Sequence, residues 1–308
     1  MKKFYGELKK LNGIKKFFLP FVLIYVMLFS FFTVVSADAG NTDAAAVNEY
    51  ARIDFFGANN TGSVRINVAS KLDKRVKVTI EKGDVKYTYD LKNDTTPEVY
   101  PLQLGNGEYT VKIWTEVVDS KYALTLSAKY IVNLNDSNAP FLNSNQYVNF
   151  SKDSKAVKIA AGLTDKYTDD IDKVTAIYDF VISSLVYDTD KANAAAKGQL
   201  NGYLPSIDTI VASGKGICFD YAAVFAAMLR SQGIPAKLVT GYVKPGNAYH
   251  AWNEFYIKDK GWFKINDMKF DGQKFERIDP TFDSTSKSSK KVIQFIGDGS
   301  NYSKFQEY

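Results

Sequence analysis

The chain from Tyr50 to Asn133 alternates apolar and polar residues in short runs. Runs such as SVRINVAS, RVKVTIEKG and EYTVKIWTEV are rich in β-branched and aromatic residues, and turn signals such as Gly105-Asn106-Gly107 separate them. Alternation with period two is typical of strands, and about six or seven of them without a helical stretch predict a small antiparallel β-sandwich. We expect its inner faces to bury Val64, Ile66, Val68, Val111, Ile113 and Val117.

Helical spacing appears only after a polar, turn-rich stretch over residues 135–153. An acidic first turn at Asp169, Asp170 and Asp172 precedes a series of apolar residues at helical intervals. Acids at the N-terminus complement the helix dipole, so this pattern predicts an amphipathic helix. Its apolar residues are Ile171, Val174, Ile177, Tyr178, Val181, Ile182 and Leu185.

Two further helices and a series of strands follow. One helix is expected from Ser206 to Ala212 with a stop at Gly214, and another begins near Cys218 and stops at Gly233. Strand-like runs come afterwards: AKLVTGYV, HAWNEFYI, WFKI, MKF and FERID. Because the helices precede the sheet, the predicted fold class is α+β and not doubly wound. The predicted organisation is a β-sandwich over residues 49–134, a linker over 135–153 and an α+β domain over 154–308.

The N-terminus has the pattern of an export signal. Six lysines precede an apolar run from Phe17 to Val35, and small residues follow at Ser36 and Ala37. This pattern predicts a signal peptide over residues 1–37, cleaved after Ala37, with a polar leader over 38–48. An uncleaved anchor is the alternative, because a helix of this length can cross a bilayer. Both interpretations predict a secreted or cell-surface protein, and membrane contact is expected only through this segment and only if it is uncleaved.

Charge argues against nucleic acid as a partner. The formal net charge is +5, but residues 1–37 hold six of the 39 Lys and Arg and one of the 34 Asp and Glu. The remainder carries 33 of each sign, and so lacks the basic excess that nucleic-acid-binding proteins normally show. We expect a protein or peptide partner instead.

The single cysteine, Cys218, is a candidate nucleophile. Gly214 and Gly216 precede it and a predicted helix follows, so the thiol lies at or near a helix N-terminus, where negative charge is favoured. A small core residue is the alternative interpretation, because the apolar face of that helix extends into its first turn. A lone thiol in an exported chain is either reactive or forms an intermolecular link.

The single histidine, His250, is the candidate general base. A cysteine nucleophile needs a base within hydrogen-bond reach, and imidazole titrates near neutral pH. A packed or surface histidine is the alternative interpretation. With one Cys and one His, a metal site of the common Cys and His type is out of reach, and we expect neither a metal nor another cofactor.

A third group should orient the imidazole, and the spacing leaves several candidates open. In a hairpin that turns at Asn266-Asp267, His250 lies opposite Asp283, and Asp279 shares that face. If the turn instead lies in Lys258-Asp259-Lys260-Gly261, Asn266 or Asp267 comes nearer to the histidine.

Three blocks carry a family resemblance: GKGICFDYAAVFAAMLRSQGIPAKLVTGYV, then YHAWNEFYI, then FERIDPTFD. Together they resemble the core of the transglutaminase-like superfamily, whose members share a papain-like Cys-His-Asp triad. The resemblance implies that Cys218, His250 and Asp279 are the catalytic residues, and that Asp267 and Asp283 are ordinary carboxylates. It also implies that Trp252 packs beside the site and that Asp220 is solvated or supports the site from behind.

One departure from compact members of that superfamily is the segment KDKGWFKINDMKF, which separates the histidine strand from the strand before Asp279. Phe275 also stands where a tryptophan is common. The resemblance implies acyl transfer at amide or peptide bonds through a thioester, and we expect hydrolysis by a peptidase or amidase. A protein-crosslinking transglutaminase is one alternative, and a catalytically silent surface binding protein is another. The expected substrate is a protein or peptide, such as a cell-wall peptide.

Overall fold

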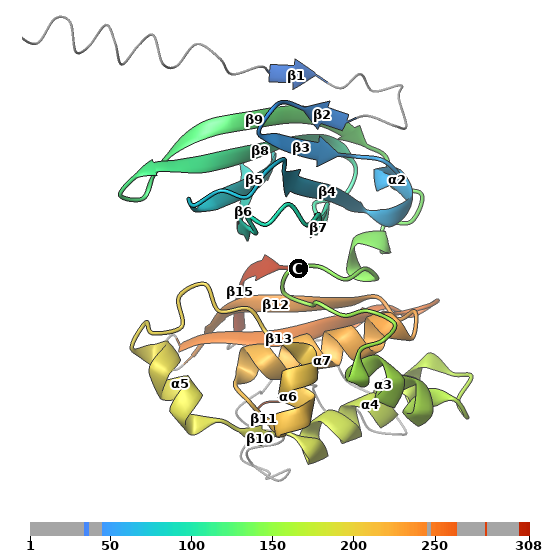
Figure 1. Cartoon of the computed structure of the whole chain (residues 1–308). Coiled ribbons are helices and arrows are strands. Elements are labelled where there is room, and N and C mark those ends of the chain that lie inside the picture. The colour runs from blue at the N-terminus through green and yellow to red at the C-terminus, as the bar shows by residue number, and fades with distance from the viewer. Residues whose placement is uncertain (1–33, 37–44, 245–247, 264–280, 282–301) are drawn as a thin grey trace, which may run out of the picture.

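The computed structural model describes residues 34–36, 45–244, 248–263, 281 and 302–308. Its first half is made of strands, and its second half packs helices against a sheet, with the two halves stacked one above the other (Figure 1). The fold is therefore α+β, with an antiparallel sandwich before a mixed domain, as the residue pattern predicts.

Two sheets face each other in the first half. One is ordered β1-β9-β8-β5-β6, and its pairs are antiparallel except for the parallel pair of β1 and β9. The other is ordered β2-β3-β4-β7 and is antiparallel throughout. The strands of the first sheet are β1 Val34–Ser36, β9 Lys121–Val132, β8 Gly107–Val118, β5 Val76–Lys82 and β6 Val85–Leu91. Those of the second are β2 Ala45–Val47, β3 Ala51–Asp54, β4 Ser63–Val68 and β7 Glu98–Pro101, with the short helix α2 at Ala58–Thr61.

The sandwich core confirms the predicted inner faces at every position but one. Val64, Ile66, Val68, Val111 and Ile113 are at most 1% exposed. Val117 is 53% exposed, so its predicted burial is wrong. The pairing of β8 with β9 shifts register at Ile113/Trp114 and again at Glu116/Val118. Each irregularity interrupts the alternation of faces, so period two no longer predicts which side chains are buried at the end of β8.

Helices dominate the start of the second half. The predicted helices after residue 169, before Gly214 and from Cys218 are all present, whereas α3 and α5 were not predicted. The elements are η2 Ala139–Phe141, α3 Lys155–Thr164, α4 Asp170–Ser184, β10 Val186–Tyr187, α5 Thr189–Ala196, α6 Ile207–Ser213, β11 Lys215–Gly216 and α7 Cys218–Ser231. Helix α4 begins as its sequence predicts, because the Asp169 side chain caps it by accepting from the Ile171 N–H.

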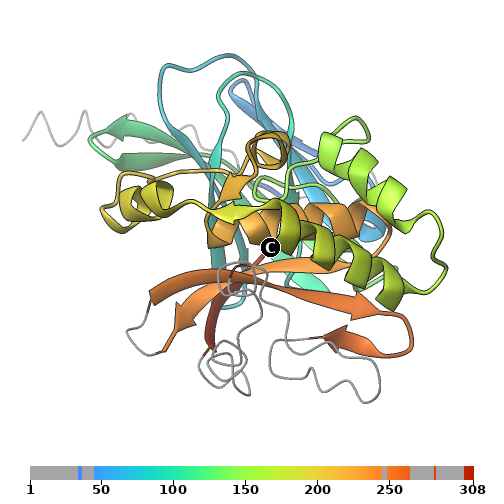
Figure 2. The same cartoon turned by 90° about the horizontal axis from the view of Figure 1, so that it is seen from below.

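Helix α7 is the centre of this half. It is buried on all sides from Asp220 to Arg230, and it is in contact with α3, α4 and α6 as well as with the sheet (Figures 1 and 2). A helix that is apolar all round has this central place because every face must be covered. Its small residues, Ala222, Ala223, Ala226 and Ala227, let the neighbouring elements approach closely.

The sheet under α7 is ordered β14-β13-β12-β15. Its strands are antiparallel: β14 Gly261–Phe263, β13 Ala248–Ile257, β12 Ala236–Val243 and β15 Tyr302–Glu307. Because Ile257 pairs with Gly261, the hairpin turns at residues 258–260, and the hairpin with a turn at Asn266-Asp267 is wrong. The predicted strands MKF and FERID lie outside the described residues.

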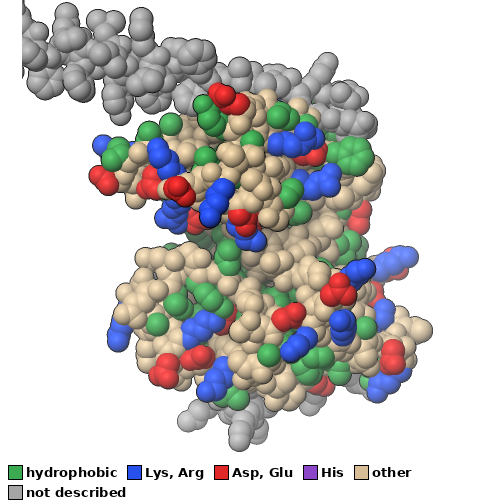
Figure 3. Space-filling view, viewed as in Figure 1, with side chains coloured by type: hydrophobic (Ala, Val, Ile, Leu, Met, Phe, Trp, Pro, Cys, Tyr) green, Lys and Arg blue, Asp and Glu red, His purple; other side chains and the backbone are tan. Residues whose placement is uncertain are grey.

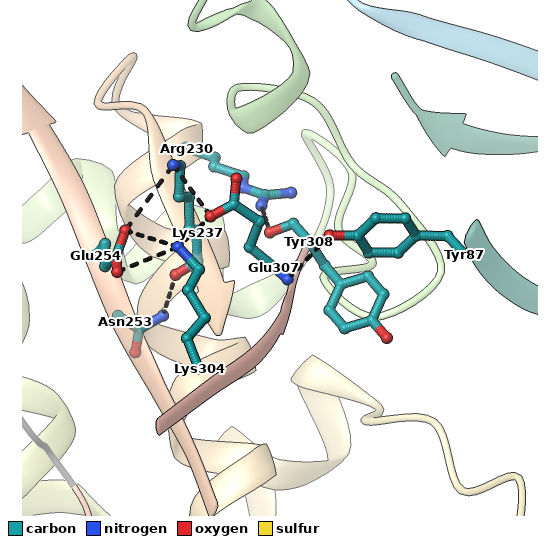
Figure 4. Close-up of polar contacts among 8 residues, drawn as sticks. All are labelled: Tyr87, Arg230, Lys237, Asn253, Glu254, Lys304, Glu307 and Tyr308. Carbon is teal, nitrogen blue, oxygen red and sulfur yellow. Dashed lines mark hydrogen bonds and ion pairs between the residues drawn. The ribbon is translucent and has the colours of Figure 1, made fainter. Parts of the chain in front are cut away.

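A buried guanidinium joins α7 to three other segments. Figure 4 shows its contact with Tyr308. Arg230 is 3% exposed, and it donates to the main-chain oxygens of Ala236 at 2.9 Å, Asn143 at 2.7 Å and Tyr308 at 2.7 Å. Burial lowers the pKa of Arg230 to about 9, which leaves it protonated at neutral pH. The charge therefore holds the segment after the sandwich, the start of β12 and the end of β15 against one helix.

The N-terminal segment is described only at Val34–Ser36, which form β1. The rest of the predicted signal peptide lies outside the described residues. Within the described part of the chain, no helix is both long enough and apolar enough to cross a bilayer.

Replacing Gly241 with alanine should weaken the attachment of β15. A Cβ at this position would lie 2.1 Å from the main-chain O of Ser303 and 2.7 Å from Cη2 of Trp252. We expect G241A to lose ~1–3 kcal/mol of unfolding free energy in urea denaturation, as overpacked sites do. The control is G162A in α3, where the added Cβ meets nothing within 4 Å. Because alanine has the higher helix propensity, G162A should raise the unfolding free energy by ~0.5–1 kcal/mol. Equal stability of the two variants would contradict the close approach of β15.

Candidate active site

Cys218 is the first residue of α7, as the glycines before it predict. Gly214 ends α6 in the left-handed conformation with φ of 65°, and Ile217 is extended at the N-cap of α7. The half-buried thiol thus lies at the end of the helix where main-chain N–H groups lack partners within the helix and the dipole favours negative charge.

Asp220 fixes this turn from inside the protein. It is fully buried, and its Oδ2 accepts from the Ile217 N–H at 2.8 Å and from Lys191 Nζ at 2.6 Å. Its Oδ1 accepts from the Tyr203 hydroxyl at 2.6 Å. The interpretation of Asp220 as a solvated residue is wrong, and that of a support behind the site is confirmed. The sequence signal that could have shown this is the acid at the third helical position, whose side chain accepts from the N-cap N–H as the acid of a capping box does.

The same carboxylate ties down the segment between α5 and α6. Lys191 lies on α5 and Tyr203 follows it in the chain, and the Lys191 ammonium also lies 4.1 Å from the Tyr203 ring centroid. Burial, together with the hydrogen bond to Asp220 and its charge, raises the pKa of Tyr203, so its hydroxyl remains a donor. The wall formed by this segment is thereby attached to the turn that carries Cys218.

His250 lies near the start of β13, opposite Gly241 of β12. It is 7% exposed, and its ring centroid lies 6.3 Å from that of Trp252 and 6.1 Å from that of Tyr302. Asn253 donates to the main-chain oxygen of Ala222, so its side chain lies on the face of β13 that packs on α7. Because side chains alternate along a strand, Tyr249 lies on that same face, and His250 and Trp252 lie on the opposite one. Trp252 packs beside the histidine, as the resemblance implied.

One cavity of about 740 Å³ is lined by both Cys218 and His250. Strands β5 and β6 of the sandwich contribute one wall, and the start of β13 contributes another. The third wall comes from α5, the segment after it and the turn before α7. On the face drawn in Figure 3 the surface is hollowed between the two halves of the molecule. The sequence reasoning missed the sandwich wall, which is formed by Lys77, Thr88, Tyr89 and Asp90.

Tyrosines surround the thiol in this cavity. Burial raises the pKa of Tyr187 and that of Tyr249, and negative charge on Cys218 would raise both further. Both phenols therefore keep their protons at neutral pH. They offer hydrogen-bond donors and ring faces to a molecule bound at the sulfur.

The third predicted triad member, Asp279, lies outside the described residues, as do the alternatives Asn266, Asp267 and Asp283. Thr281, two residues after Asp279, is described and is 5% exposed. Among the described residues, no group of three or more His, Cys, Asp and Glu side chains is placed to hold a metal ion.

The sequence model of the Transglutaminase-like superfamily matches residues 157–266, which hold Cys218 and His250. This domain belongs to the transglutaminase-like superfamily. The match covers the helices α4 to α7 and the strands β12 to β14, and it leaves the sandwich outside.

Curated relatives of this chain are much longer than the regions that match. The uncharacterized protein YebA of Bacillus subtilis is 27% identical over 201 residues, which cover 58% of this chain and 26% of YebA. A protein-glutamine gamma-glutamyltransferase of Pseudomonas aeruginosa is 32% identical over 71 residues, which cover 19% of this chain and 11% of that enzyme. A crystal structure from Cytophaga hutchinsonii, described as that of a candidate cysteine protease, aligns with a TM-score of 0.40 at 18% identity and covers 86% of this chain and 73% of that one.

Replacing Asp220 with asparagine should destabilise the turn that carries Cys218. The Lys191 ammonium would lose its buried partner, and D220N should cost ~2–4 kcal/mol of unfolding free energy, because an uncompensated charge remains near the core. The double variant D220N/K191M should recover part of that loss in the same urea titration. D190N, an exposed acid on α5, is the matched control and should change stability by less than ~0.5 kcal/mol. A D220N protein as stable as D190N would contradict the supporting role of the carboxylate.

Proposed function

We propose that this chain is an exported, cysteine-dependent acyl-transfer enzyme that acts on amide or peptide bonds. Cys218 is the nucleophile, His250 the general base and Asp279 the group that orients the imidazole. The single observation that carries the proposal is that Cys218, at the start of α7, and His250 line one cavity in a transglutaminase-like domain.

The reaction begins with proton transfer from the Cys218 thiol to the His250 imidazole. The thiolate then attacks the amide carbon, a C–S bond forms, and the carbonyl oxygen takes the negative charge. The Cys218 main-chain N–H at the helix N-terminus is suited to stabilise that charge. The imidazolium returns its proton to the amine, the C–N bond breaks, and a thioester remains.

Water completes the cycle in the proposed hydrolytic enzyme. His250 takes a proton from water, the hydroxide attacks the thioester, and the C–S bond breaks to release a carboxylic acid. Transfer to a lysine amine is the second candidate, supported by the similarity to the gamma-glutamyltransferase of Pseudomonas aeruginosa. We favour water because that similarity covers 19% of this chain and 11% of that enzyme.

The substrate class that best fits the cavity is a polypeptide. The cavity volume of about 740 Å³ accommodates several residues of a peptide substrate, and side chains from both halves of the molecule line the cavity. The basic and apolar N-terminal segment supports export by a signal peptide, so the proposed substrates are extracellular proteins or cell-wall peptides.

Exchange of His250 for asparagine should slow the reaction of Cys218 with iodoacetamide at pH 7. We expect a loss on the order of 100-fold, because general-base assistance typically contributes about 10²- to 10⁴-fold. The label should be absent from C218A. The bifunctional reagent 1,3-dibromoacetone should also bridge Cys218 to His250 in the wild type, since these are the single Cys and the single His of the chain. Alkylation of H250N at the wild-type rate, with no bridged peptide in the wild type, would refute the pair.

Incubation with casein and a fluorescent amine should separate hydrolysis from transfer. We expect casein fragments or released small products to accumulate with the wild type and not with C218A, because water resolves the thioester. Incorporation of the amine into casein, dependent on Cys218, would instead identify the protein as a crosslinking enzyme. D279N should retain the fold, measured by circular dichroism, and lose activity in either assay.

A further inference from the structure

The cavity wall carries one cation and one anion from the sandwich, and the two differ in how they are paired. Among the described residues that line the cavity, the lysines, arginines and acids are Lys77 of β5 and Asp90 of β6. The two face each other across the antiparallel pair of strands. A bound molecule therefore meets one cation and one anion on that wall.

The anion is already neutralised by a neighbour. Arg75 donates from Nε to Asp90 Oδ1 at 2.8 Å and from NH2 to Oδ2 at 2.8 Å. This bidentate pair uses both carboxylate oxygens, which is the strongest geometry available to an arginine and a carboxylate. Because Asp90 is paired with Arg75, it does not form an ion pair with Lys77, its neighbour across the two strands.

The cation has no such partner among the described residues. The Lys77 ammonium lies 4.9 Å from the ring centroid of Tyr122, a contact that does not neutralise its charge. Lys77 is half-buried at the cavity, so solvent screens its charge less than that of a fully exposed lysine. The remaining described wall is uncharged and combines aromatic, aliphatic and small polar side chains, as expected for a site that positions a ligand with few polar contacts.

We propose that Lys77 binds a carboxylate of the peptide substrate, and that the sandwich is thereby the specificity wall of the active site. This inference rests on the proposed function, since it names the substrate class that Cys218 attacks. The substrate is a peptide that places an acidic side chain or a free C-terminal carboxylate against β5 while its scissile amide lies at the sulfur. Arg75 keeps Asp90 from repelling that carboxylate.

Two alkylating reagents of different charge test the wall without knowledge of the substrate. Iodoacetate is anionic and iodoacetamide is neutral, and both react with the Cys218 thiolate. The rate with iodoacetate divided by the rate with iodoacetamide reports the charge that the cavity presents. The same ratio for the free thiol N-acetylcysteine amide is the reference. We expect K77E to lower the ratio by about three- to tenfold, because the cation that attracts iodoacetate is replaced by a carboxylate that repels it. K77Q should give an intermediate value.

Lys86 provides the matched control. It is an exposed residue of the neighbouring strand β6 that does not line the cavity, so K86E makes the same charge change on the same sheet. K86E should keep the wild-type ratio within about 1.5-fold, as expected for a screened surface charge. Equal effects of K77E and K86E, or no effect of K77E, would overturn the inference. Slow iodoacetamide reaction of the wild type would instead refute the proposed function.

Three peptides then distinguish the source of the carboxylate as protectants of Cys218 against iodoacetamide. They are acetyl-Ala-Glu-Ala-amide, acetyl-Ala-Gln-Ala-amide and acetyl-Ala-Gln-Ala with a free C-terminus. Stronger protection by the first identifies an acidic side chain, and stronger protection by the third identifies a chain terminus. In both cases K77Q should abolish the advantage over the neutral peptide. Equal protection by all three in the wild type would overturn the inference.

Discussion

The buried helix α7 carries a charge near each end, and the arrangement of the second half depends on how those charges are paired. Asp220 in the first turn accepts from Ile217, Lys191 and Tyr203. Arg230 in the last turn donates to the carbonyls of three segments. Each sign complements the helix dipole at its own end. A buried charge is costly unless it is hydrogen-bonded, so movement of a partner away from Asp220 or Arg230 would cost free energy.

One of these two buried charges stabilises the candidate site, and the other stabilises the junction between the two halves. Asp220 attaches α5 and the segment after it to the turn of Cys218, and so it shapes one wall of the cavity. Arg230 donates to the main-chain oxygen of Tyr308, the residue after β15, and the Tyr308 ring packs with those of Tyr87, Tyr89 and Tyr147. Figure 4 shows Arg230, Tyr308 and Tyr87. That aromatic cluster joins the sandwich to the α+β domain. The sandwich wall can face the thiol because the junction is packed and hydrogen-bonded.

The proposed site combines the turn of Cys218 from one half with a cavity wall from the other. In the α+β domain the chemistry needs little more than a helix N-terminus and an imidazole, which many unrelated proteins could share. The cavity adds tyrosines to them, together with the cation of Lys77 and the Asp90 carboxylate that Arg75 already pairs. Selectivity would then reside in β5 and β6, far in sequence from the residues that react.

The sequence by itself determined the strands β3, β4, β5, β6, β8 and β9 of the sandwich, the helices α4, α6 and α7 and the candidates Cys218 and His250. These depend on periodicity, capping and residue chemistry within short windows, which the chain carries locally. The tertiary structure decided the turn of the hairpin after Ile257, the exposure of Val117 and the burial of Asp220. It also decided that Lys77 and Cys218 share one cavity. Each of these depends on contacts between residues distant in the chain or on an irregular strand register, and local periodicity specifies neither.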